Sequence, residues 1–157
     1  MRRPLVAGNW KMNGSLFALP GLLAGVKQGA ADTGGVEVAV FPPYVYLPQV
    51  QQELSGSQVA WGAQNLSDKE SGAFTGEVAA PMLLEFGCQY VLVGHSERRT
   101  LFGESDDAVA AKVSAARRAG LKPVLCIGET LEERENDATE AVVARQLQAV
   151  MDFEGIQ

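Results

Sequence analysis

The one histidine of the chain, His95, lies directly after a short apolar run, Tyr90–Val93, and a glycine. Residues 96–102 predict a short helix, whose N-terminal end is electropositive. That field opposes protonation of a nearby ring and so favours a neutral imidazole. A neutral imidazole can donate a hydrogen bond to a carbonyl oxygen and polarise it. From position alone, a structural histidine with satisfied hydrogen bonds is an equally good interpretation.

Other polar residues also follow apolar runs. Lys11 can attract a phosphate or stabilise a developing oxyanion, although an ordinary surface lysine is the simpler interpretation. Asn9 can orient a ligand or cap a turn. Glu97 can pair with Lys11 or Arg98, or lie at the helix N-terminus, where a carboxylate is favoured. Because ligands of parallel α/β folds bind at the carboxyl ends of the strands, this rim is the candidate site.

Two nucleophile chemistries are disfavoured. The run Gly94–Arg98 is close to the hydrolase pattern Gly-x-Ser-x-Gly, but an arginine replaces the second glycine. His95 directly precedes the serine, which is a poor position for a base. Cys126 has no second histidine to activate it. We expect Cys88 and Cys126 to be buried free thiols in a reducing compartment.

Composition narrows the class of protein further. The 157 residues are 46% apolar and 20% charged, a composition typical of a globular chain. The net charge of −6 argues against nucleic acid as a partner. With one histidine and no clustered cysteines, no metal site is expected. The pairs Arg98–Arg99 and Arg117–Arg118 fit ion pairs better than phosphate clamps. Without a signal peptide or an apolar membrane span, we expect a cytoplasmic protein without a membrane partner.

Five apolar runs predict parallel strands. Their spacing, about thirty residues in most cases, fits strand–loop–helix units with right-handed crossovers. Near-continuous apolar runs are typical of strands covered on both faces. We expect a single α/β domain over residues 1–157. The expected strands are Pro4–Ala7, Val36–Phe41, Val59–Ala63, Tyr90–Val93 and Pro123–Ile127.

Helix signals lie between these runs. A helix is expected after Ser105, with an apolar face and Gly120 at its end. The first helix is expected to begin or bend at Pro20. Capping boxes are predicted at Thr130 with Glu133 and at Asp137 with Glu140. The apolar face after Ser105 comprises Val109, Val113 and Ala116, and that of the last helix comprises Val142, Val143, Leu147, Val150 and Met151.

Several motifs together resemble the triosephosphate isomerase family, in its order and spacing and over the whole chain. They are Ala7–Asn13 (AGNWKMN), Gly76–Glu77, Val93–Arg99 (VGHSERR) and Leu125–Leu131 (LCIGETL). The resemblance implies an incomplete TIM (β/α)8 barrel, with about five parallel strands and their crossover helices.

The resemblance also implies roles. The family interconverts dihydroxyacetone phosphate and glyceraldehyde 3-phosphate, a small phosphorylated triose, without a cofactor. Asn9 and Lys11 would contact substrate, and Lys11 would oppose the phosphate and enediolate charge. His95 would be the electrophile that passes protons between the substrate oxygens, a role carried over from the family. Glu97 would position Lys11.

A loop beginning at Gln64 and Asn65 resembles the family's dimer loop. It ends at Glu77. Thr75 would lie at its tip, near the partner's active site, so a homodimer or another self-association is expected.

The sequence departs from the family where the chain ends. A full barrel has eight strands and about 250 residues. Nothing in the sequence matches the family's base glutamate after the sixth strand, its closing sixth loop or its later phosphate-binding loops. We therefore expect almost no isomerase activity from this chain alone, and apolar exposure on the first and fifth strands.

Two functions remain open at this stage. One is an isomerase of which this chain is the N-terminal part, its missing segment either supplied by another chain or lost by truncation or proteolysis. The other is a non-catalytic partial barrel that serves as an assembly module.

Overall fold

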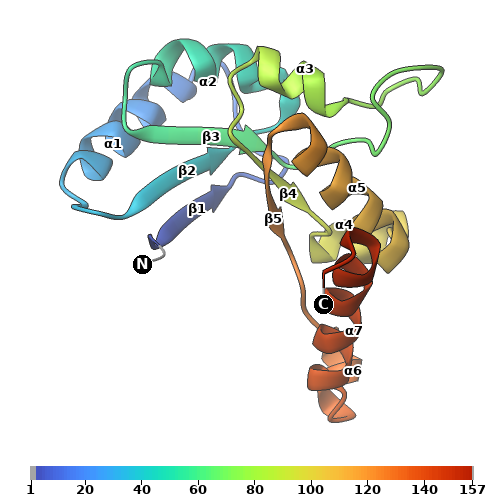
Figure 1. Ribbon diagram of the computed structural model, residues 1–157. Helices are drawn as coiled ribbons and strands as arrows, with labels where there is room; N and C mark the ends of the chain where they lie inside the picture. Colours follow the sequence, from blue (N-terminus) through green and yellow to red (C-terminus); the bar gives the residue numbers. More distant parts are fainter. Residues whose placement is uncertain (1–2, 157) are drawn as a thin grey trace. The chain divides into compact units, whose positions relative to one another are not determined.

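The computed structural model describes residues 3–156, which form two compact units (Figure 1). Residues 3–64 and 81–91 make up the first unit, and residues 65–80 and 92–156 the second. Strand β4 (Tyr90–Val93) runs from one unit into the other. The single-domain expectation stays a prediction.

The first unit contains three complete parallel strands. They are β1 (Leu5–Asn9), β2 (Glu37–Phe41) and β3 (Val59–Ala63). Strand β1 pairs with β2 along its whole length, and β3 pairs with the first half of β4, where Gly62 opposes Tyr90. A Cβ atom on Gly62 would lie 2.3 Å from the Tyr90 carbonyl oxygen, so only glycine permits this approach. Together with β5 (Lys122–Leu125), the strand order is β1-β2-β3-β4-β5.

Helices α1 (Leu19–Ala31) and α2 (Leu47–Leu54) pack beside these strands. A short 3₁₀ helix, η1 (Tyr44–Tyr46), leads into α2, and α3 (Ala80–Glu85) precedes β4. Pro20 lies in the first turn of α1, as expected, where a missing N–H costs no helical hydrogen bond. The fully buried side chains of α1 and α2 are Leu19, Leu23, Val50 and Leu54.

The second unit carries the C-terminal half of β4, strand β5 and four helices. The Cys126 amide, just after β5, donates to the Val93 carbonyl at 2.8 Å, which joins β5 to the end of β4. Helices α5 and α7 lie side by side (Figure 1). The four helices are α4 (Ser96–Phe102), α5 (Asp106–Ala119), α6 (Leu131–Glu135) and α7 (Thr139–Glu154).

Helix α5 confirms its sequence prediction. The Ser105 side chain accepts the Ala108 N–H at 3.2 Å, which caps the first turn. Gly120 ends the helix with a φ of 94°, a left-handed conformation that favours glycine. The predicted apolar face, Val109, Val113 and Ala116, is buried.

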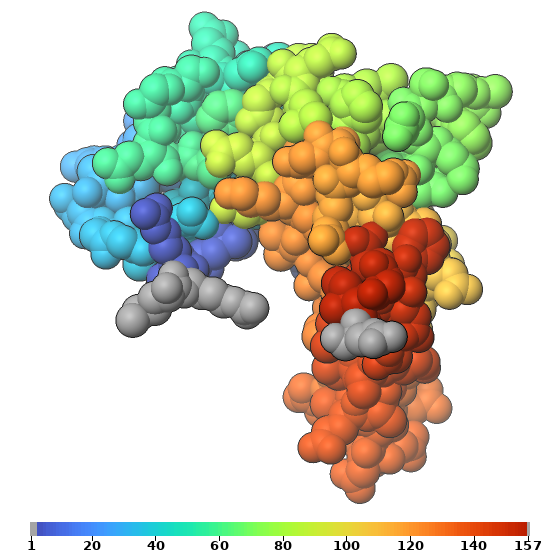
Figure 2. Space-filling view, in the orientation of Figure 1, coloured from blue at the N-terminus to red at the C-terminus, as the bar shows by residue number. Residues whose placement is uncertain are grey.

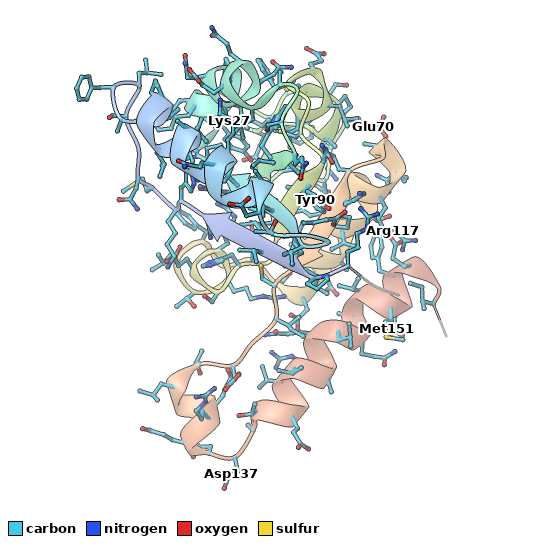
Figure 3. All side chains as sticks on the ribbon, turned by 90° about the vertical axis from the view of Figure 1, so that its left-hand side faces the viewer. Lys27, Glu70, Tyr90, Arg117, Asp137 and Met151 are labelled. Atoms are coloured by element: carbon cyan, nitrogen blue, oxygen red, sulfur yellow. The ribbon has the colours of Figure 1, made fainter. Side chains whose placement is uncertain are left out.

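The prediction for the start of α7 is wrong. Asp137 does not cap the helix: the N-cap is Ala138, without a side-chain hydrogen bond. Asp137 instead takes a φ of 56° and lies in the turn after α6 (Figure 3). The helix packs through Val142, Val150 and the unpredicted Gln146, whereas Leu147 of the expected apolar face is 42% exposed. The Thr130–Glu133 capping box of α6 is present as predicted.

Strand β1 differs from the interior strands. Its three middle residues are exposed, and Val6 is 59% exposed, whereas β4 is buried throughout. Within the described residues β1 pairs with β2 alone. The expected apolar exposure of the first strand is therefore present.

Candidate functional site

The chain after β1 turns sharply at Lys11. The Asn9 side-chain oxygen accepts the Lys11 N–H at 2.9 Å, and Lys11 takes a φ of 53°, unusual for a residue with a Cβ atom. The Gln64 side chain, at the end of β3, donates to the carbonyl oxygens of Lys11 at 2.9 Å and of Phe41 at 2.7 Å. Asn9, Lys11 and Gln64 thus form one hydrogen-bonded group in the first unit.

The chain after β4 places His95 at the N-cap of α4. Its Nδ1 accepts the Glu97 backbone N–H at 3.2 Å. A nitrogen that accepts a hydrogen bond carries no proton, so a neutral ring holds its proton on Nε2. The Glu97 carboxylate lies 3.6 Å from the same Nδ1, a distance that becomes an ion pair only if the ring is protonated. The tautomer that this hydrogen bond favours presents an N–H donor at Nε2.

Three of the four arginines predicted to form ion pairs do so: Arg98, Arg99 and Arg117. Arg98 and Lys112 both bind Glu104 at 2.5 Å, and Lys112 also donates to the Asn65 side chain at 2.9 Å. Glu104 is only 7% exposed, and its second oxygen is buried without a hydrogen bond. Burial by itself would raise the pKa of Glu104, but hydrogen bonds from Lys112 and Arg98 outweigh it and lower the pKa. Through Lys112, this network joins Asn65, at the base of the predicted dimer loop, to the middle of α5.

The other predicted ion pairs lie on α4 and α5. Arg99 binds Asp106 at 2.6 Å, and Arg117 pairs with Glu154. Arg118 donates to the Ser114 hydroxyl at 3.0 Å rather than to a carboxylate. These contacts account for the positions of the arginines without a role in binding phosphate.

The predicted dimer loop is exposed around its tip. Thr75 and Glu77 are exposed, and the loop closes through a hydrogen bond of 2.8 Å from the Ser67 N–H to the Val78 carbonyl. Figure 2 shows the loop as a whole, in green, at the surface. Leu66 and Ser67 are buried, so the base of the loop is anchored while its tip is free to make contacts.

Sequence reasoning missed a polar cavity of about 440 Å³ in the second unit. Gln146 of α7 forms part of its wall and is 4% exposed. Its side-chain oxygen accepts the Gly128 N–H at 2.8 Å, and its nitrogen donates to the Gly128 carbonyl at 3.1 Å. A lone glutamine in an apolar helix stripe was the only sequence signal for this contact.

The predicted site residues are divided between the two units. Asn9, Lys11 and Gln64 share the first unit. The second unit holds the remaining five: His95, Glu97, Asn65, Thr75 and Glu77.

Comparisons with known proteins identify the family. A model of the family described as triosephosphate isomerase matches residues 4–156. The chain belongs to the triosephosphate isomerase family.

Relatives and a solved structure agree with this assignment. The triosephosphate isomerases of Dechloromonas aromatica and Thiobacillus denitrificans are 64% and 61% identical over 156 residues, which is 99% of this chain and 62% of each relative. The crystal structure of triosephosphate isomerase from Bartonella henselae matches with a TM-score of 0.90 at 42% identity, over 95% of this chain and 62% of that one.

These matches define the fold. The chain has the fold of an incomplete TIM barrel, with five parallel strands and their crossover helices. It spans about 62% of the length of the curated triosephosphate isomerases it matches.

The cysteines do not suggest a nucleophile in this triosephosphate isomerase family member. Burial raises the pKa of the Cys88 thiol to about 12. Burial also raises the pKa of Cys126, against the opposing charge of Arg99. Cys88 is buried as expected, but Cys126 is only half-buried. Both thiols are therefore protonated at neutral pH, which disfavours nucleophilic attack.

Residues 3–156 contain neither a candidate metal cluster nor a candidate membrane span. No group of three or more histidine, cysteine or carboxylate side chains there is arranged to hold a metal ion. No helix in that range has the length and apolar character needed to cross a membrane.

Proposed function

We propose that this chain carries the electrophile and substrate-binding part of a triosephosphate isomerase site. The reaction interconverts dihydroxyacetone phosphate and glyceraldehyde 3-phosphate by proton transfer and needs no cofactor. The observation that carries the proposal is the hydrogen bond from the Glu97 N–H to His95 Nδ1, which leaves a proton on Nε2. An Nε2 donor facing a substrate carbonyl polarises it and stabilises the enediolate that forms.

Lys11 and Asn9 complete this part of the site. Lys11 opposes the phosphate and the developing enediolate charge, and Asn9 contacts substrate while holding the Lys11 turn. A backbone with positive φ is a strained conformation, and strain of this kind is often kept where it directs a functional side chain. Glu97 positions Lys11 in the assembled site. The protein acts in the cytoplasm.

The proposal includes near-inactivity of the chain by itself. In the family, proton abstraction requires a glutamate base after the sixth strand, and residues 1–157 offer no match for it. General-base catalysis contributes about 10²–10⁴-fold in rate. A segment that supplies the base, the closing loop and the phosphate-binding loops would complete the site.

The first test is a coupled isomerase assay on the purified chain, with its intact mass confirmed on the same sample. We expect turnover indistinguishable from buffer. Adding a polypeptide that corresponds to the remaining 38% or so of the Dechloromonas aromatica relative should restore turnover. Turnover of the chain alone that tracks the confirmed mass would contradict the missing-base account.

A matched pair of variants locates the electrophile in the complemented sample. His95→Ala removes the imidazole with its Nε2 donor and should abolish the restored turnover. Lys122→Gln should leave the restored turnover unchanged, because Lys122 begins strand β5 while the candidate site lies at the carboxyl ends of the strands. Equal turnover of His95→Ala and the unsubstituted chain would overturn the role of His95.

Self-association is the second part of the proposal. The loop 64–77 docks a second copy, with Thr75 at the contact and the family's homodimer as the result. Several large apolar side chains are highly exposed and support association: Met12, Phe17, Val45, Leu101 and Phe102. Light scattering coupled to size exclusion should report a dimer that Thr75→Arg weakens.

The alternative is a non-catalytic assembly module. The exposed middle of β1 favours it, because an apolar strand with an open edge promotes association. A stable oligomer that does not gain turnover when the complementary segment is added would support this function over the isomerase.

A further inference from the structure

The side chain of Arg99 returns to the strand end that carries His95. The Arg99 N–H donates to the His95 carbonyl at 3.1 Å, so Arg99 lies one helical turn after the histidine. Its Nε donates to the Gly94 carbonyl oxygen at 2.8 Å. That oxygen belongs to the peptide group whose nitrogen is that of His95. The contact therefore holds the peptide from which the imidazole projects.

The Arg99 guanidinium uses its other nitrogens on two further segments. Nη1 donates to the Asp106 carboxylate at 2.6 Å, at the start of α5, and Nη2 reaches the Cys126 carbonyl at 3.5 Å, just after β5. The side chain is only 13% exposed. A planar fork of fixed N–H groups can hold three acceptors at once, whereas a lysine ammonium cannot match that geometry.

Gly94 leaves room for this contact. It has a φ of 73°, and a Cβ atom there would lie 3.0 Å from Arg99 Nη2 and 2.9 Å from Val109. Arg99 can therefore pack against the peptide before His95 only because Gly94 has no side chain, and this packing fixes the orientation of that peptide.

We propose that Arg99 is a positioning residue for His95. By holding the Gly94 carbonyl, it keeps Nδ1 aligned with the Glu97 N–H and so keeps the imidazole proton on Nε2. The proposal rests on the proposed function of His95, but its test needs no turnover. The test therefore stands whatever the outcome of the isomerase assay.

The chain's single histidine allows a direct measurement. Long-range ¹H–¹⁵N spectra of the imidazole report which nitrogen carries the proton. In the unsubstituted chain we expect the neutral ring to be the single tautomer with its proton on Nε2. Arg99→Met should convert it to a mixture of both neutral forms and should accelerate exchange of the Glu97 amide. Arg99→Lys should give a smaller shift in the same direction.

Arg145→Met is the matched control. Arg145 binds the same carboxylate, with its Nε 3.0 Å from Asp106 Oδ2, whereas the side chain that donates to the Gly94 carbonyl is that of Arg99. It should leave the imidazole spectrum unchanged. A spectrum of folded Arg99→Met identical to that of the unsubstituted chain would overturn the proposal, as would an equal change in Arg145→Met.

Asp106→Asn provides a milder variant in case Arg99→Met fails to fold. It leaves Arg99 in place but weakens its anchor, so the imidazole should shift toward the Arg99→Met pattern by a smaller amount. Circular dichroism confirms folding of each variant. No imidazole shift in folded Asp106→Asn and Arg99→Lys would equally overturn the proposal.

Discussion

The chain after β1 and the chain after β4 hold their polar side chains in different ways. At Lys11 the turn is local: a contact two residues away and a backbone with positive φ define it, with Gln64 closing it from β3. At His95 the backbone is held by a half-buried arginine and by ion pairs that reach other elements of the second unit. The first arrangement stores strain, and the second relies on dense packing and charge. Substitutions after β1 and after β4 should therefore change the stability of the fold by different amounts.

The largest effect is expected at Gly94. Gly94→Val forces a side chain into Val109 and Arg99 and demands an unfavourable φ. Overpacking and backbone strain together should destabilise the fold by about 3–5 kcal/mol. Urea denaturation measures the loss. Gly103→Ala is the control, because its φ of 67° carries the backbone strain without any neighbouring atom. Equal losses in the two variants would show that packing at Gly94 is looser than described.

Breaking the ion-pair network should have the next largest effect. Glu104→Ala leaves Arg98 and Lys112 without their buried partner and should cost about 3 kcal/mol. Glu154→Ala, which breaks a more exposed pair with Arg117, should cost less than about 1 kcal/mol. The free energies of unfolding from urea titrations test this order, and a larger loss in Glu154→Ala would contradict it.

Lowering the pH should weaken the same ion-pair network around Glu104. The pKa of Glu104 is lowered from its ordinary value of 4.5 in the folded chain. Its contribution is therefore fully present above pH 4.5 and is lost as the pH falls through the lower folded value. Stability measured from neutral pH down to about pH 3 should fall less steeply in Glu104→Gln than in the unsubstituted chain. Parallel curves would show that Glu104 does not titrate in this way.

At the strained turn after β1, a substitution at Lys11 should raise the stability of the fold instead of lowering it. Lys11→Gly relieves the positive φ and should stabilise the fold by about 1 kcal/mol. Met12→Gly, at an exposed neighbour outside the left-handed region, should give no gain. Thermal melts compare the two, and destabilisation by Lys11→Gly would mean that its side chain contributes more than the strain costs.

The smallest effect is expected at Asn9. Asn9→Ala removes one exposed hydrogen bond to the Lys11 N–H and should cost about 0.5 kcal/mol, while Asn9→Asp keeps the acceptor and should cost less. Urea titrations of both variants test the difference. A loss as large as that of Glu104→Ala would remove the contrast between the two strand ends.

Local features of this protein could be predicted from its sequence. The strands β3 and β4 and the helix α4 have the predicted bounds, and the caps at Ser105, Gly120 and Thr130 are present. Each of these depends on residues a few positions apart, where backbone geometry and hydrogen-bonding side chains act directly. Four motifs together, the one around His95 among them, were likewise enough to indicate the family.

Only the tertiary structure decided the rest. The pattern at Asp137 satisfied the rule for a capping box, yet the turn after α6 gave that residue a positive φ and moved the cap to Ala138. Gln64 was predicted as part of a loop but holds the Lys11 turn, and Gln146 replaced an apolar neighbour in the packed face of α7. Arg99 and Glu104 acquired their partners from other elements. These outcomes depend on which distant groups meet and which remain buried, and spacing along the chain does not specify either.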